Sequence, residues 1–127
     1  MNSFRLSGAK NADSTGRAYE VDVQDAIAYA ASVALKTKLF AAKTIFRIAQ
    51  ATGALSITIG VGDSTTPPMS GDEAEIWLSS DGTGRVVTFS TGFAPTGTLT
   101  MVASKKAVAN FVFDGAAWIE KSRAIGA

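Results

Sequence analysis

The sequence predicts a mainly β protein, an antiparallel β-sandwich of jelly-roll-like type or a small barrel, with an extended N-terminal arm. Three observations predict this class. After residue 43, large apolar residues alternate with small or polar ones in several runs, as on strands with one buried face. Turn signals rich in Gly, Pro and Asp separate these runs, and no convincing long helix interrupts them. The first twenty or so residues are small and polar and show no sustained period.

The length of 127 residues suits one domain, which would bury about two-thirds of its unfolded surface. We divide the chain into an arm, residues 1–22, and a β-sandwich domain, residues 23–127. The arm is either an extended segment that a partner orders or a disordered terminus, and the sequence leaves both alternatives open.

Residues 22–42 are ambiguous between helix and strand. Their alanine content favours a helix, with Asp22 or Asp25 as its cap. Large side chains at every second position favour a strand that begins at about Ile27. We expect the strand, and the alternating residues are Ile27, Tyr29, Val33 and Leu35.

Seven short runs after residue 43 alternate as strands do. They are Thr44–Ala49, 55–59, Glu73–Ser79, Arg85–Ser90, 98–101, Lys106–Phe113 and Ala117–Ser122. Asp81-Gly82 predicts a hairpin turn between the third and fourth runs, and Asp114-Gly115 predicts one between the last two. Trp118 should pack against Phe113 or Phe111 across that second hairpin.

The composition excludes much of the usual catalytic chemistry. The chain has no His and no Cys, so it has no imidazole base, no thiolate nucleophile, no disulfide and no Cys-based zinc site. The formal net charge of +1 gives no basic stripe for nucleic acid, and no stretch approaches the length of a membrane span. We therefore expect no enzyme activity, no cofactor, no metal, no nucleic acid and no membrane contact.

Two acidic segments are candidates for catalysis or metal binding. Asp72, Glu73 and Glu75 could form the carboxylate pair of a glycosidase, but charged outward positions on a strand look the same. The loop that starts at Asp81 lacks the repeated Asp and Asn ligands of a calcium loop, so Asp81 is better interpreted as a turn residue.

Trp77 is the most informative single side chain. It lies on the Glu73 and Glu75 side of its predicted strand, opposite Ala74, Ile76 and Leu78. It either contacts a partner chain or a sugar, or it is core beneath a second sheet. The sequence leaves both alternatives open.

The second half of the chain resembles a module of tailed-bacteriophage virion proteins. The resemblance rests on five segments: GDE (71–73), LSSDGTGRVVTF (78–89), GFAPTGT (92–98), ASK (103–105) and FVFDGAAWIEKSR (111–123). Such modules look like β-sandwich or jelly-roll-like units that usually assemble as trimers, and they occur in head decoration (cement) proteins, head fibres and tail fibres or spikes. The family offers no catalytic residues.

The resemblance implies a cement protein that binds the major capsid protein on the outer capsid surface of the virion as a homotrimer. The absence of a fibrous repeat favours cement over fibre, and the Cys-free composition suits assembly in the host cytoplasm. The alternative is a receptor- or carbohydrate-binding module of a head fibre, tail fibre or tailspike. The predicted partner contacts are Phe4, Leu6, Arg17 and Trp77.

Overall fold

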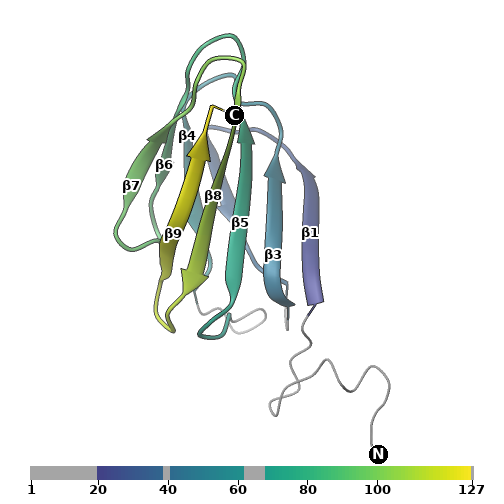
Figure 1. Cartoon of the computed structure of the whole chain (residues 1–127), viewed down its shortest axis with the longest axis vertical. Coiled ribbons are helices and arrows are strands. Elements are labelled where there is room, and N and C mark those ends of the chain that lie inside the picture. Colours follow the sequence, from purple (N-terminus) through teal and green to yellow (C-terminus); the bar gives the residue numbers. More distant parts are fainter. Residues whose placement is uncertain (1–19, 39–40, 62–67, 127) are drawn as a thin grey trace, which may run out of the picture.

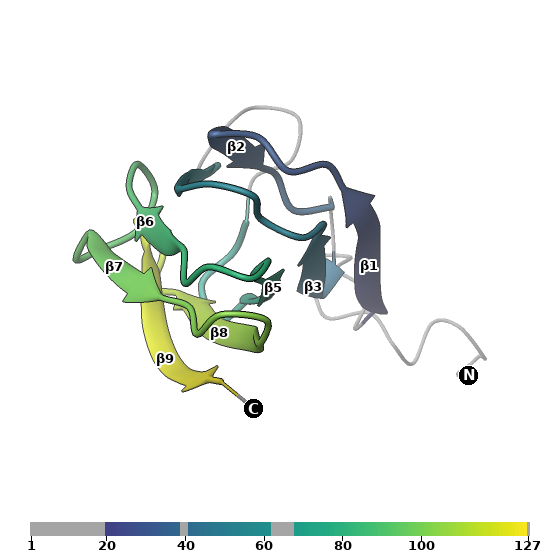
Figure 2. The same cartoon turned by 90° about the horizontal axis from the view of Figure 1, so that it is seen from above.

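Two β-sheets pack face to face in the computed structural model, which describes residues 20–38, 41–61 and 68–126 (Figures 1 and 2). The five-stranded sheet has the order β1 (Glu20–Ile27), β3 (Ala41–Ile48), β5 (Glu73–Ser79), β8 (Lys106–Phe113) and β9 (Trp118–Ile125). The four-stranded sheet has the order β2 (Ser32–Leu35), β4 (Leu55–Ile59), β6 (Val86–Phe89) and β7 (Gly97–Thr100). The described residues contain no helix, so the mainly β class is confirmed.

The chain winds between the two sheets. Strands β1 to β6 alternate between them, and each strand lies parallel to the one two elements later: β1 to β3, β2 to β4, β3 to β5 and β4 to β6. Parallel neighbours need a crossover connection, and here each crossover contains a strand of the other sheet. The last strands add antiparallel pairs, β6 with β7, β5 with β8 and β8 with β9.

The predicted antiparallel pairing is therefore wrong for the four pairs formed among the first six strands, which are parallel. The Asp81-Gly82 segment is not a hairpin turn either, since β5 and β6 belong to different sheets. The barrel alternative is also wrong, because each sheet ends in two edge strands within the described part of the chain. The hairpin at Asp114-Gly115 joins β8 to β9 as expected.

The described part of the ambiguous segment forms strands and no helix. It contains most of β1, a break at residues 28–31, β2 and the start of β3, so no strand starts at Ile27. Val33 and Leu35 on β2 are buried, while Ile27 at the end of β1 and Tyr29 in the break pack beside the core. The last three residues of the predicted arm, 20–22, belong to β1.

The core lies between the sheets, where large and small side chains are paired across strands. On β5 and β8, Ala74 is opposite Phe111 and Ile76 is opposite Ala109. All four side chains are buried. Each large side chain thus fills the space beside a small one, which allows dense packing between sheets.

Aromatic rings link the two sheets at one end of the core. Phe89 on β6 and Phe111 on β8 have ring centroids 5.1 Å apart, and Phe93 lies within 5.1 Å of both. The edge-on and tilted contacts suit the charge distribution of aromatic rings. Because Phe89 and Phe111 come from different sheets, this cluster fixes how the sheets lie on one another.

Candidate functional site

The outward surfaces of the two sheets differ in chemistry. The four-stranded sheet presents mainly small hydroxyl side chains, together with Ala34 and the exposed Val86. The hydroxyl residues are Ser32, Ser56, Thr58, Thr88, Thr98 and Thr100. The five-stranded sheet presents apolar side chains between charged ones, and we call this surface the outer face. Its apolar members are Val21, Val23, Ile45, Trp77, Val108, Val112 and Ile119. A sheet that faces only water normally carries polar residues outward, so the outer face has the composition of a contact surface.

The exposure of β1 makes this contrast sharper. Val21 and Val23 are 56% and 46% exposed. They lie on the edge strand β1, which has one neighbour, β3. Sequence reasoning missed both residues because it placed Val21 in the arm and expected a strand only from about Ile27, after Val23. Their spacing of two was the available signal, since Val at alternate positions is typical of a strand.

Ion pairs neutralise most of the charge on the outer face. Lys43 Nζ lies 3.2 Å from Glu75 Oε1, and Lys121 Nζ lies 3.8 Å from Glu73 Oε2. The half-exposed Lys121–Glu73 pair contributes little to folding stability. A partner that docks on the outer face therefore contacts apolar side chains that lie between charges already paired within the chain.

Trp77 lies at the centre of the outer face and is half-buried by its neighbours, not by a second sheet. Its indole N–H donates a hydrogen bond to Glu75 Oε2. The Arg47 guanidinium carbon lies 5.5 Å from the centroid of the ring, a cation–π distance. Of the two alternatives for Trp77, core beneath a second sheet is therefore wrong for the described residues. Contact with a partner stays a prediction.

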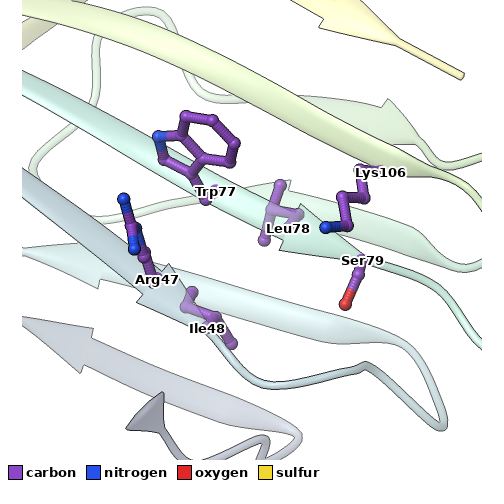
Figure 3. A pocket seen from close by; sticks show the side chains of 6 residues that line it. All are labelled: Arg47, Ile48, Trp77, Leu78, Ser79 and Lys106. Atoms are coloured by element: carbon purple, nitrogen blue, oxygen red, sulfur yellow. The ribbon is translucent and has the colours of Figure 1, made fainter. Parts of the chain in front are cut away.

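A hollow of about 140 Å³ opens beside Trp77 at the end of β3 and β5 (Figure 3). Arg47 and Trp77 lie next to one another at its one side, and Lys106 leans in from β8 toward β5 at the other. The hollow is lined by Arg47, Ile48, Trp77, Leu78, Ser79 and Lys106.

The three candidate carboxylates do not form one site. Asp72 is buried, and its Oδ2 accepts a hydrogen bond of 2.8 Å from the backbone N–H of Met69, so it closes the turn before β5. Glu73 and Glu75 lie on the outer face, where Lys121 and Lys43 engage them. No group of three or more acidic side chains suited to a metal occurs among the described residues.

Asp81 is a turn residue, as the sequence predicts. Its carboxylate accepts two hydrogen bonds from Arg85, of 2.9 and 2.8 Å, and one of 3.2 Å from the backbone N–H of Thr83. The Arg85 guanidinium holds the pKa of the Asp81 carboxyl below its usual value. These contacts leave the carboxylate engaged within its own loop.

Three of the four predicted partner contacts, Phe4, Leu6 and Arg17, lie outside the described residues. Trp77 is the fourth, and it lies on the outer face. In the described parts of the chain, no helix has the length and apolar character that would allow it to span a membrane.

The sequence matches no protein-family model and no curated protein. The resemblance to phage virion modules therefore stays a prediction, and the outer face is the feature on which a function can be argued.

Proposed function

We propose that the protein is a decoration (cement) protein of a tailed-bacteriophage head. It binds the major capsid protein on the outside of the shell and associates with itself as a homotrimer. The single observation that carries this proposal is the outer face, an aromatic and apolar sheet surface without a partner among the described residues. The phage resemblance of residues 71–123 supplies the kind of particle.

Burial of the outer face would favour association. Each Å² of apolar surface removed from water contributes about 25 cal/mol, and Trp at the centre of a contact is a frequent hot spot. Val21, Val23 and Ile45 extend the apolar area from Trp77 to the edge strand β1.

The mechanism is structural. A protein that binds the assembled shell but not its separated subunits stabilises the shell by mass action. Two sheets locked by a packed core provide a rigid body for this purpose, and none of the proposed steps requires a reaction. The protein would act on the outer capsid surface of the virion after assembly in the host cytoplasm.

Co-sedimentation with shells that lack the protein tests this function. Wild-type protein should sediment with the shells, and the double variant Val21→Lys/Val23→Lys should bind at least tenfold more weakly. The matched control, Ser32→Lys/Ala34→Lys, places the same charges on the edge strand β2 of the other sheet and should bind like wild type. Wild-type protein that stays in the supernatant would contradict the proposal.

The hollow beside Trp77 favours a second candidate, a carbohydrate- or receptor-binding module of a fibre or spike, because sugars stack on exposed aromatic rings. Against it, Arg47 lies over the ring and Glu75 already accepts the indole N–H. Tyr29, the other aromatic candidate, donates its hydroxyl to Ala54 O at 2.9 Å and packs beside the core. Specific binding on a glycan array would favour this second function.

A further inference from the structure

We propose that the hollow beside Trp77 is a binding site for a carboxylate side chain, a Glu or Asp presented by the protein chain on which the outer face docks. This inference deepens the proposed function and rests on it for the identity of the partner.

The hollow carries two cations and no carboxylate among its lining residues. Arg47 contacts only one carboxylate of the described chain, Asp25, and that distance is 3.6 Å between Nη1 and Oδ1. This separation is too long for a good hydrogen bond, and both side chains are about half exposed or more, at 49% and 64%. The guanidinium therefore keeps N–H donors for a further acceptor.

Lys106 is the second cation. Within the described residues its ammonium group has no ion pair, in contrast to Lys43 and Lys121 on the same face. Ser79 also lines the hollow, and it is opposite Lys106 in the β5–β8 register. Two positive groups and one hydroxyl donor around an open hollow complement a carboxylate, which only accepts hydrogen bonds.

The surroundings favour a protein carboxylate over that of a sugar acid. A sugar ring needs a free aromatic face for stacking, and Arg47 lies over the Trp77 ring. The outward residues near Trp77 include Ile45 and Val108, which are apolar and suit the side chains around an acidic residue on another protein. The Glu75 carboxylate is also near, and the Trp77 indole and Lys43 already engage it. A charged contact inside an apolar surface would also fix the register in which the partner docks.

The test is an NMR titration of the full-length protein labelled at its two tryptophan indoles. The probes are N-acetylglutamic acid α-amide, which carries one side-chain carboxylate, and its neutral analogue N-acetylglutamine α-amide. The glutamate probe should shift the Trp77 indole signal and leave that of buried Trp118 unchanged. The glutamine probe should require at least a tenfold higher concentration for the same shift.

Three variants locate the effect. Arg47→Gln and Lys106→Gln should each weaken binding of the glutamate probe at least fivefold. Lys121→Gln, which removes a cation paired with Glu73 elsewhere on the outer face, should change it less than twofold. Equal responses to the two probes, or equal losses in all three variants, would overturn the site.

A third probe, the methyl glycoside of glucuronic acid, separates the two sources of a carboxylate. Tighter binding of this sugar acid than of the glutamate probe would overturn the assignment to a protein partner. The titration needs no shell, so its failure with intact shell binding would remove this inference and leave the proposed function. Probe binding without shell binding would remove the proposed function and leave the carboxylate site.

Discussion

The indole nitrogen of Trp118 donates a hydrogen bond of 3.1 Å to the carbonyl oxygen of Gly60, 58 residues earlier in the chain. Trp118 begins β9 of the five-stranded sheet, and Gly60 follows β4 of the other sheet. The indole is fully buried, and its ring centroid lies 5.1 Å from that of Phe113. One side chain thus joins the C-terminal hairpin to the opposite sheet.

Substitution of this residue should be costly. Trp118→Phe removes the donor, leaves the Gly60 oxygen without that partner and opens a small cavity, so the free energy of unfolding should fall by about 2–4 kcal/mol. The control Trp77→Phe, on the half-buried outer face, should cost less than about 1 kcal/mol. Urea denaturation of both variants measures the difference, and similar losses would contradict the role assigned to Trp118.

Gly92 should tolerate no side chain. Its φ of +99° suits glycine, and a Cβ at this position would lie 2.0 Å from the carbonyl oxygen of Ile59. Gly92→Ala should therefore destabilise the fold by about 3 kcal/mol or more, since backbone must move. Gly82→Ala is the matched control, because nothing lies within 4 Å of its Cβ, and it should change stability by less than about 0.5 kcal/mol. Thermal denaturation that ranks the two variants equally would contradict this account.

Thr44 is a site where a substitution should stabilise the protein. Its side chain is buried on β3, and its hydroxyl has no hydrogen-bond partner among the described residues. Thr44→Val keeps the shape and removes the unsatisfied hydroxyl, so the free energy of unfolding should rise by about 1 kcal/mol. Thr44→Ser keeps the hydroxyl and loses a methyl group, so it should be destabilising. If chemical denaturation gives Thr44→Val a free energy of unfolding no higher than that of the wild type, the hydroxyl has a hydrogen-bond partner and the prediction is wrong.

Two turn aspartates should make the fold sensitive to acid. Arg85 lowers the pKa of Asp81, and the backbone N–H groups of Ala117 and Ala116 lower the pKa of Asp114. In the unfolded chain each carboxyl would return to about 3.9. The stabilisation from a lowered pKa is complete above that value and is lost as the pH falls through the folded pKa.

Asp81→Asn and Asp114→Asn should therefore lower stability at neutral pH and flatten its decline below about pH 4. Stability measured by urea denaturation at a series of pH values between 7 and 2 provides the comparison. A decline below pH 4 as steep as that of the wild type in both variants would show that these carboxylates do not cause it.

Self-association should depend on the outer face. Light scattering coupled to size exclusion should give the mass of a trimer of 13.1 kDa chains at micromolar concentration. Ile45→Lys places a charge among the apolar side chains next to Trp77 and should shift the protein toward monomer. Thr58→Lys, on the hydroxyl-rich face of the other sheet, should remain trimeric. A wild-type monomer would count against the homotrimer.

The sequence predicted the strands that have one clearly buried side. β4, β5 and β8 lie where alternation placed them, and Trp118 packs against Phe113 as expected. Alternation reports which side of a strand is buried, and that information is local. It was weak at β1, because this edge strand exposes Val21 and Val23 as well as polar residues.

The pairing direction could not be read from the same pattern. Asp81-Gly82 is the signal of a tight hairpin, yet here Asp81 binds Arg85 and the chain crosses to the other sheet. A turn signal marks where a strand ends, whereas the next partner depends on contacts far away in sequence. The hollow was missed for the same reason, since Arg47, Trp77 and Lys106 come together only through the parallel β3–β5 pair and the β5–β8 pair.

The most direct test of the central claim is a cryo-EM map of the particle that carries this protein. The account predicts density for the two-sheet domain on the outer surface of the head, with the outer face around Trp77 covered by another protein chain. Density at the tail, or a domain that contacts the shell only through the hydroxyl-rich face of the four-stranded sheet, would contradict it.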